Sequence, residues 1–221
     1  MNCKISQEKL ENVLKALERN NIKAFYVENR CKAVELVSSF IEKGSVVSFG
    51  GSVTLSEIGI FDLLRNGDYR LLDRNAEGNN PEDIQKIYRD SFNADTYLCS
   101  SNAITENGEL YNVDGMANRV TALTFGPKQV IVIAGINKIV KNLDEAAHRV
   151  KAITAPKNCV RLNKDTYCAK FGRCVAIEEG KKGMTDGCNS KDRICRNFVI
   201  TAKQQNPDRM KVILVGEELG Y

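Results

Sequence analysis

Side chains that can do chemistry gather in one stretch of this sequence, residues 100–119, where amides, carboxylates and a guanidinium surround two glycines. The stretch directly follows residues 96–99, an apolar run that is typical of a β-strand. In open α/β sheets, ligands bind beyond the carboxyl ends of the strands, where loops are free to vary while the sheet keeps them rigid. We therefore expect residues 100–119 to form part of a binding site.

Glu106 lies beside Asn107-Gly108, a pair that favours a tight turn between two short strands, 103–105 and 109–113. Such a hairpin would hold the Glu106 carboxylate at a strand end. There it would be able to act as a base, a nucleophile or a hydrogen-bond acceptor. Glu106 is the catalytic candidate of this sequence.

The second half of the stretch supplies four candidate ligand-binding residues, Asn102, Asp114, Asn118 and Arg119. Asp114-Gly115 and Asn118-Arg119 are expected to open a helix. Arg119 is able to bind an anion as a two-pronged donor, or to pair with Asp114 or Glu106. The alternative interpretation is a polar network that only stiffens the turn.

A glycine turn, Gly50-Gly51-Ser52, joins an expected strand at 45–49 to an expected helix that includes Thr54. Glycine allows close backbone approach, and the free amides and the two hydroxyls suit a phosphate or carboxylate. The spacing matches neither the dinucleotide fingerprint nor the Walker A loop, so a simple tight turn stays open as an alternative.

Asn137 and Lys138 follow the apolar run 129–134, which is typical of a strand buried on both faces. If the sheet is parallel, both residues reach the same crevice as 100–119. Lys138 would then hold an anionic ligand, or would be a solvated loop lysine. His148, the single histidine, lies on a predicted helix surface, which disfavours a Ser-His-Asp hydrolase.

Four of the eight cysteines, Cys168, Cys174, Cys188 and Cys195, are grouped in an irregular segment. Four thiolates satisfy tetrahedral zinc and equally an iron–sulfur cluster, although the spacing fits no standard motif. Free thiols or a redox-active pair are the alternative. The scattered cysteines, Cys3, Cys31, Cys99 and Cys159, are expected to be small buried apolar residues.

The charge and hydropathy of the sequence argue against two kinds of partner, nucleic acid and the membrane interior. The chain of 221 residues has 32 basic and 28 acidic residues, a net charge of +4, with no basic block along it. This argues against nucleic acid as the main partner. No apolar run approaches the ~18 residues of a membrane span and the first residues lack an apolar signal region, so we expect a cytoplasmic protein without a membrane span.

Segments with strand and helix patterns alternate along the chain, which predicts the α/β class with a mostly parallel sheet covered by helices. We expect one domain over residues 1–221. A Cys-rich lobe, at about 166–196, would be inserted before two last strands at 198–200 and 211–215.

Five ordered motifs, at 50–59, 101–108, 114–120, 125–127 and 135–140, together resemble the LUD-domain family, the lactate utilization protein C-like group. The resemblance extends through Ala155-Pro156 and the final cysteines, although residues 175–187 form an insertion between the second and third grouped thiols. It implies a fold similar to that of sugar-phosphate isomerases, CoA-transferases and formyltetrahydrofolate cyclo-ligase. It also implies a role in L-lactate oxidation beside iron–sulfur partner subunits.

Three functional hypotheses follow from the sequence. The first is a component of organic-acid oxidation that binds a small anionic ligand in the strand-end crevice. The second is an acyl-CoA transferase-like enzyme with Glu106 as nucleophile, because Glu106-Asn107-Gly108 resembles the Glu-Asn-Gly of class I CoA-transferases. The third is a non-enzymatic zinc or iron–sulfur subunit that docks a partner through its Cys-rich lobe.

Overall fold

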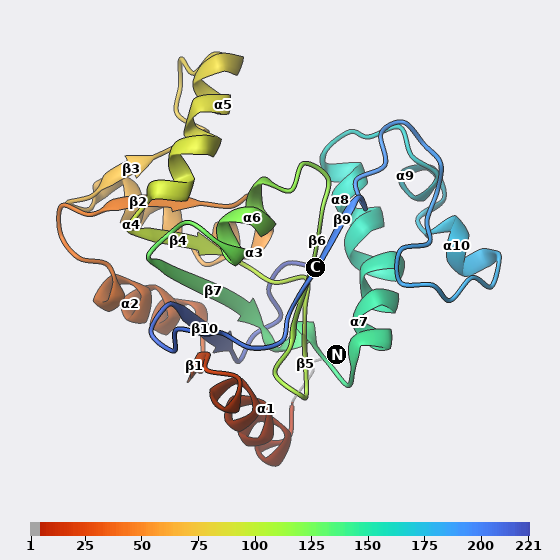
Figure 1. Cartoon of the computed structure of the whole chain (residues 1–221), viewed down its shortest axis with the longest axis horizontal. Coiled ribbons are helices and arrows are strands. Elements are labelled where there is room, and N and C mark those ends of the chain that lie inside the picture. The colour runs from red at the N-terminus through yellow and green to blue at the C-terminus, as the bar shows by residue number, and fades with distance from the viewer. Residues whose placement is uncertain (1–4) are drawn as a thin grey trace.

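The computed structural model describes residues 5–221, so the prediction for Cys3 lies outside the described residues. A six-stranded sheet in which every pair is parallel forms the centre of the molecule (Figure 1). The α/β class with a mostly parallel sheet is confirmed. In spatial order the strands are β1 (Lys23–Val27), β10 (Met210–Val215), β7 (Gln129–Gly135), β4 (Thr96–Cys99), β2 (Val46–Phe49) and β3 (Arg70–Leu72).

Strand β7 is the core of this sheet because both of its faces are buried. Val130 and Val132 belong to one apolar cluster, whereas Ile131 and Ile133 belong to another on the opposite face. Alternating side chains of one strand point to opposite faces, so a continuous apolar run fits a strand covered by helices on both sides.

Helices cover the two faces unequally. The first cluster takes apolar side chains from α1 (Gln7–Arg19) and α6 (Asn118–Thr124). The second takes them from α2 (Arg30–Phe40), α3 (Val53–Glu57) and α4 (Ile60–Asn66). Helix α5 (Pro81–Asp90) has no fully buried residue, and it projects from the body in Figure 1. It is followed by the short η1 (Ser91–Asn93).

A second, four-stranded sheet stands beside the first, and the sequence patterns did not predict it as a separate sheet. Its order is β8 (Ile139–Val140), β5 (Ala103–Thr105), β6 (Leu110–Asp114) and β9 (Asn197–Thr201). The expected hairpin is confirmed as the antiparallel pair β5–β6. The short η2 (Ile136–Lys138) connects β7 to β8 and so links the two sheets along the chain.

The helix that carries His148 is part of a longer helical stretch. It consists of α7 (Leu143–Arg149), the π-helical η3 (Val150–Thr154) and α8 (Ala155–Arg161). Pro156 lies just after the π-helical turn, which is where a helix tolerates a residue without an N–H. His148 is exposed on this helix, as predicted.

The Cys-rich segment contains the short helices α9 (Tyr167–Phe171) and α10 (Val175–Glu178) in otherwise irregular chain. It lies on the far side of α7 and α8 from the main sheet (Figure 1). None of the helices in residues 5–221 is long and apolar enough to cross a membrane.

The β5–β6 turn docks the second sheet onto α1. Gly108 has φ +79°, and a Cβ placed there would lie 2.6 Å from the backbone carbon of Ala16. Asn20 completes the contact by donating its side-chain amide to the carbonyl of Asn107 at 2.9 Å. Only glycine satisfies both the left-handed backbone and the close approach.

We predict that Gly108→Ala destabilises the protein more than Gly44→Ala. Gly44 has φ +73° but no atom within 4 Å of its ideal Cβ, so it reports the backbone cost alone, about 1–2 kcal/mol. Overlap with α1 should add about 1–3 kcal/mol at Gly108. Urea unfolding of both variants measures the difference, and equal losses would show that the turn does not support α1.

Candidate ligand-binding site

A polar cavity of about 100 Å³ lies where the carboxyl end of β4, the start of β5 and the end of β6 come together. It contains predicted site residues from three separate parts of the sequence, which are listed here: Gly51, Ser52, Thr54, Asn102, Asp114, Arg119 and Lys138. The expected crevice at strand ends is therefore present. It is built between the two sheets rather than over one of them.

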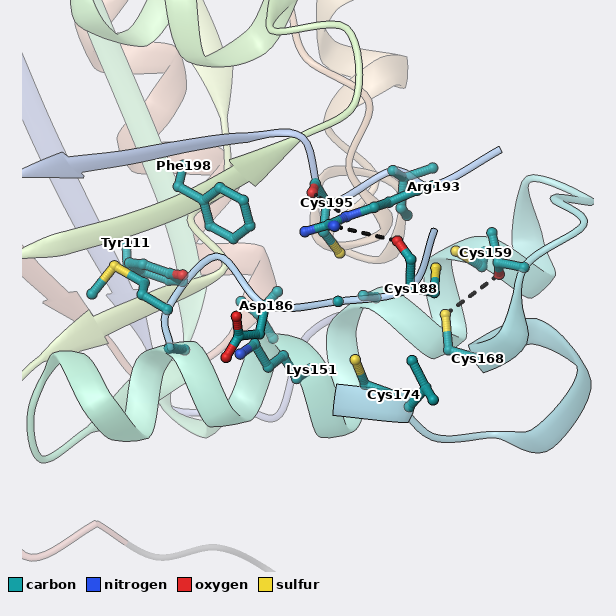
Figure 2. A pocket seen from close by; sticks show the side chains of 18 residues that line it. Tyr111, Lys151, Cys159, Cys168, Cys174, Asp186, Cys188, Arg193, Cys195 and Phe198 are labelled. Carbon is teal, nitrogen blue, oxygen red and sulfur yellow. Dashed lines mark hydrogen bonds between the residues drawn. The ribbon is translucent and has the colours of Figure 1, made fainter. Parts of the chain in front are cut away.

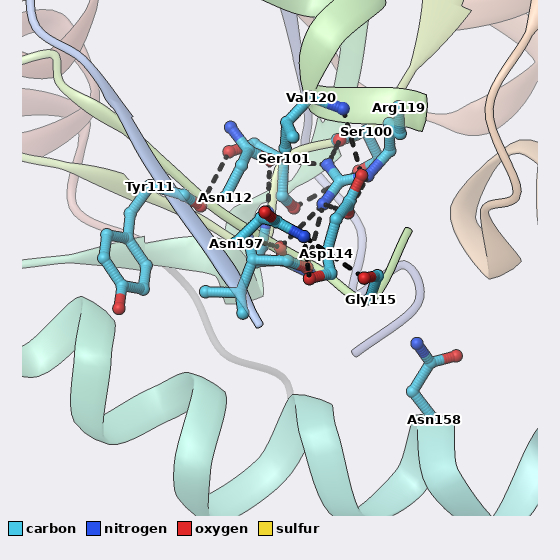
Figure 3. A network of polar contacts seen from close by, with 12 residues as sticks. Ser100, Ser101, Tyr111, Asn112, Asp114, Gly115, Arg119, Val120, Asn158 and Asn197 are labelled. Carbon is cyan, nitrogen blue, oxygen red and sulfur yellow. Dashed lines mark hydrogen bonds and ion pairs between the residues drawn. The ribbon is translucent and has the colours of Figure 1, made fainter. Parts of the chain in front are cut away.

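Arg119 forms the back wall of this cavity, and the protein itself uses all of its hydrogen-bonding capacity (Figure 3). Its Nε and Nη2 donate to Asp114 Oδ1 at 3.0 and 2.6 Å. The remaining N–H groups reach Ser100 O, Asn112 Oδ1, Asn102 Oδ1 and Val113 O. A guanidinium has five N–H donors, so none is left for a ligand.

The prediction that Arg119 binds an anion as a two-pronged donor is therefore corrected. Its alternative, pairing with Asp114, is what the structure contains. Burial acts to lower the pKa of Arg119, but the Asp114 carboxylate outweighs it and the pKa is raised. Arg119 is a permanently charged positioning residue.

Asp114 and Asn102 hold the same network from the other side. Asp114 Oδ2 accepts the backbone N–H of Val120 at 3.0 Å and so fixes the first turn of α6. Asn102 Oδ1 accepts from Val113 N as well as from Arg119. Among the described residues, the side-chain nitrogen of Asn102 donates to no acceptor, although the residue lines the cavity.

Lys138 lies at the floor of the cavity and is only 3% exposed. Its Nζ donates to Thr54 Oγ1 at 2.8 Å and to Ser100 Oγ at 2.9 Å. Within residues 5–221 it has no carboxylate in ion-pair contact, and the third N–H has no protein acceptor. A buried ammonium that is held only by hydroxyl groups is costly unless an anion joins it.

The electrostatic surroundings make Lys138 easy to deprotonate. Burial lowers the pKa of Lys138 to about 7, and the positive charges of Arg149 and Arg119 act in the same direction. Glu57 and Cys99 oppose this shift more weakly. The charge of Lys138 therefore changes near neutral pH.

Arg149 is a third buried cation beside this site, and no sequence pattern pointed to it. It donates to the carbonyls of Asn102 and Asn137 and to Thr154 Oγ1. Burial lowers the pKa of Arg149 to about 10. Arg119 and Lys138 thus line, and Arg149 adjoins, a cavity whose lining includes one carboxylate side chain, Asp114.

The glycine turn contributes to the cavity through Gly51, Ser52 and Thr54. Ser52 caps α3 by accepting the N–H of Leu55 at 3.3 Å. Gly50 lies behind the wall, where a Cβ would meet the Arg119 side chain at 3.2 Å. Its role is to let Arg119 pack against the turn.

Several lining residues were not anticipated. Thr154, Asn158 and Arg161 come from η3 and α8, and Tyr221 comes from the segment after β10. Asn158 and Arg161 are three residues apart on one helix face, which is the only local signal that pointed to them. Tyr221 carried none, because its position depends on how the chain folds back.

Besides Gly50, three predicted site residues lie outside the cavity lining. Glu106 is at the far end of the β5–β6 hairpin, where it forms a half-exposed ion pair with Lys9 of α1 at 2.6 Å. Asn137 instead fixes the final segment by bonding Leu219 N and Gly220 O. Asn118 lines an adjoining open groove. The expectation that Glu106 and Arg119 share one site is wrong, because a hairpin separates its turn from its strand ends.

A second cavity, mostly apolar, lies in the Cys-rich lobe (Figure 2). All four grouped cysteines line it, as does Cys159 of α8. Cys99 is also buried, as predicted for the scattered cysteines, but Cys31 is exposed, contrary to that prediction. The irregular segment thus gathers the grouped thiols from distant sequence positions.

The thiols are not arranged as a completed metal site. Over residues 5–221, no group of three or more His, Cys, Asp or Glu side chains is close enough to hold a metal ion. Cys168 Sγ lies 3.4 Å from Thr166 Oγ1, and interaction with the neighbouring Cys159 thiol lowers the pKa of Cys168. Burial raises the pKa of Cys195 to about 12. The donor chemistry suits a soft metal, but the sulfurs would have to move to bind one.

The family model described as LUD domain matches residues 10–215 of this sequence. The match covers both sheets and the Cys-rich lobe. The chain belongs to the LUD domain family. The resemblance inferred from the five motifs is confirmed.

Among solved structures, this LUD domain is similar to a DUF162 family protein from Deinococcus radiodurans, with a TM-score of 0.52 and 13% identity over 96% of this chain and 99% of that one. At this identity the likeness shows the fold alone. A ribose 5-phosphate isomerase from Plasmodium falciparum matches 51% of this chain and 52% of its own, with a TM-score of 0.34 and 14% identity. No curated protein matches the sequence.

We predict that Arg119→Met destabilises this LUD domain by about 3–5 kcal/mol, because it leaves the Asp114 carboxylate buried without its partner. Arg119→Lys should also destabilise it, since an ammonium cannot supply the five donors. Lys128→Met, which removes an exposed pair with Asp95, should change stability little. Chemical unfolding measures all three, and a stable Arg119→Met variant would contradict the network's structural role.

Proposed function

We propose that this protein is a lactate utilization component whose polar cavity binds a small organic anion of the hydroxy-acid class. One observation carries the proposal. The Lys138 ammonium is buried at the cavity floor with two hydroxyl partners and a third N–H that has no acceptor among the described residues. A carboxylate oxygen would complete its coordination and neutralise the charge.

The rest of the lining suits the remainder of a hydroxy acid. Ser52, Asn102 and Asn158 contribute small polar side chains whose donors are not all used within the described chain. Arg161 adds a guanidinium at the cavity wall that has no carboxylate partner in residues 5–221. Membership of the LUD family, which is associated with lactate utilization, favours L-lactate as the first ligand to test.

The buried charges beside the cavity also favour an anionic ligand. Lys138, Arg119 and Arg149 are all less than 10% exposed, and Asp114 is the carboxylate directly paired within this group. Arg119 is neutralised by Asp114, which leaves two buried positive charges. Bringing an anion into the cavity would reduce this imbalance, so binding should also stabilise the fold.

We predict that L-lactate binding weakens as the pH rises above about 7. The pKa of Lys138 is lowered to about 7, so its ammonium is lost over this range while the lactate carboxylate stays ionised. The stability of the ligand-free protein changes with pH in the opposite direction. From about pH 7 to the unfolded pKa of 10.5 the unfolded chain binds the extra proton, so the free energy of unfolding rises with pH.

Lys138→Met is the variant that tests this site. It should reduce L-lactate affinity by at least about tenfold at pH 6.5, which corresponds to the loss of one charge-assisted hydrogen bond, and it should abolish the pH dependence. Glu106→Gln is the matched control and should leave binding unchanged. Isothermal titration calorimetry measures both. Unchanged binding in Lys138→Met, or no binding of any hydroxy acid to the wild type, would refute the proposal.

The acyl-CoA transferase alternative is less well supported. Glu106 forms an ion pair with Lys9 on the opposite end of the hairpin and lines neither the polar cavity nor the groove beside it. A nucleophile needs a substrate site within reach of its carboxylate. Mass spectrometry after incubation with acyl-CoA should therefore find no Glu106 adduct, and a hydroxylamine-sensitive adduct would restore the alternative.

We infer a second role for the Cys-rich lobe, as a site for zinc or an iron–sulfur cluster that serves contact with an iron–sulfur partner subunit. The observation that favours it is the gathering of Cys168, Cys174, Cys188 and Cys195 around one cavity. Thiolates are suitable ligands for zinc and for an iron–sulfur cluster. Binding of either would draw the four sulfurs together.

Metal analysis of anaerobically purified protein should find stoichiometric zinc or iron, and a visible spectrum should separate the two because iron–sulfur clusters absorb visible light. Cys188→Ser should lose the metal, whereas Cys31→Ser, at an exposed cysteine outside the cavity, should keep it. A metal-free wild-type protein whose thiols all titrate would refute this role.

A further inference from the structure

An open groove continues from the polar cavity across the surface of the molecule. The cavity and the groove share the lining residues Gly51, Asp114, Arg119, Asn158 and Arg161. From there the groove runs between the loop after β3, the turn before α6 and the end of the Cys-rich lobe. A ligand seated in the cavity therefore has a path outward along this groove.

The groove lining is strongly cationic. It contains two acidic residues, Asp114 and Asp192, against six basic ones, which are Arg74, Arg119, Arg161, Lys164, Arg193 and Arg196. Its excess of four positive charges equals the net charge of the whole chain, +4. The charge that looked evenly spread along the sequence is thus concentrated on one surface.

The groove cations also lack the acidic partners found elsewhere on the surface. Of the six, only Arg119 forms an ion pair within residues 5–221. Outside the groove, in contrast, many basic side chains are paired, including Lys23, Arg30, Arg65 and Lys128. Unpaired cations on one lining create a field that attracts an anion carrying several charges.

Arg74 is held in place at the mouth of the cavity. Its guanidinium lies 5.7 Å from the Phe49 ring centroid and 5.6 Å from that of Tyr88. A Cβ on Gly51 would come within 2.5 Å of Arg74 Nη2, so the glycine turn leaves space for this side chain. Two aromatic contacts restrict the side chain without using its N–H donors, and such preorganisation reduces the entropy lost on binding.

The cationic groove is also lined by exposed apolar side chains. Met116 and Leu162 line the same groove and are 64% and 42% exposed, and the ring of Tyr88 also contributes to the lining. A nucleoside has flat apolar faces that would cover such side chains, while linked phosphates would accept from several guanidinium groups. A single small anion would leave most of these contacts unused.

We propose that the groove binds the linked phosphates of a nucleotide-type ligand, a nucleoside diphosphate or a larger phosphoanhydride, whose acidic end enters the polar cavity. Arg74 and Arg196 bind phosphate oxygens, and Arg161 lies between the groove and the cavity. Only the placement of the ligand's acidic end in the polar cavity rests on the proposed function. The phosphate contacts stand on the groove residues alone.

The test is calorimetric titration of the intact protein with ADP, AMP, adenosine and inorganic pyrophosphate, with L-lactate titrated in parallel. ADP should bind more tightly than AMP, and adenosine should show no measurable binding. Pyrophosphate should bind more weakly than ADP, because it lacks the nucleoside. Arg74→Gln and Arg196→Gln should each weaken ADP binding about tenfold, the loss of one charge-assisted contact, and leave L-lactate binding unchanged.

Arg19→Gln is the matched control, because it removes the same charge from the last turn of α1, outside the groove lining. The proposal is overturned if Arg19→Gln weakens ADP binding as much as Arg74→Gln, or if ADP binds no better than adenosine. It is also overturned if a short single-stranded RNA binds more tightly than ADP. L-lactate binding without ADP binding would refute the groove alone, whereas ADP binding without any hydroxy-acid binding would refute the proposed function alone.

Discussion

The saturated guanidinium of Arg119 is the interaction on which the arrangement of this protein depends. Its partners lie on both sides of a boundary: Ser100 follows β4 of the large sheet, whereas Asn112 and Asp114 belong to β6 of the small one. The side chain therefore ties the two sheets and the first turn of α6 together at one point. A charge in this position is tolerable only because every donor has an acceptor and Asp114 balances it.

That network determines what the neighbouring cavity is able to do. Since Asp114 is fully engaged with Arg119 and Val120, it is not available to neutralise Lys138. The lysine is left with Thr54 and Ser100 as hydroxyl partners and is almost fully buried. The Arg119–Asp114 ion pair is therefore the structural part of the site. The neighbouring Lys138 ammonium keeps one N–H without an acceptor among the described residues.

The two cavities of this LUD domain contrast in chemistry although one continuous helical stretch, α7 to α8, contributes to both. Thr154, Asn158 and Arg161 face the polar cavity, whereas Ala147, Val150 and Cys159 face the apolar, thiol-lined one. Val150 and Thr154 both belong to the π-helical turn η3, which changes the angular order of side chains along the helix. This helical stretch connects the polar cavity to the Cys-rich lobe.

Local patterns in the sequence were sufficient to predict several strands and the family. The apolar runs of β4 and β7 and the Asn107-Gly108 hairpin turn are short-range patterns, and backbone preference and side-chain periodicity are enough to produce them. The sequence also placed Gly51, Asn102 and Lys138 correctly at strand ends, because parallel strands bring their carboxyl ends to one edge.

The contacts that these side chains make depend on tertiary packing. Whether Arg119 has a free donor depends on Ser100, Asn102, Asn112 and Val113 closing around it, and no spacing rule counts those bonds. Glu106 lies outside the cavity because β5 and β6 extend their turn toward α1. Arg74 lines the adjoining groove because β3 lies next to β2 in the sheet. Each outcome is set by contacts between residues far apart in the chain, which depend on how the whole molecule closes rather than on any local pattern.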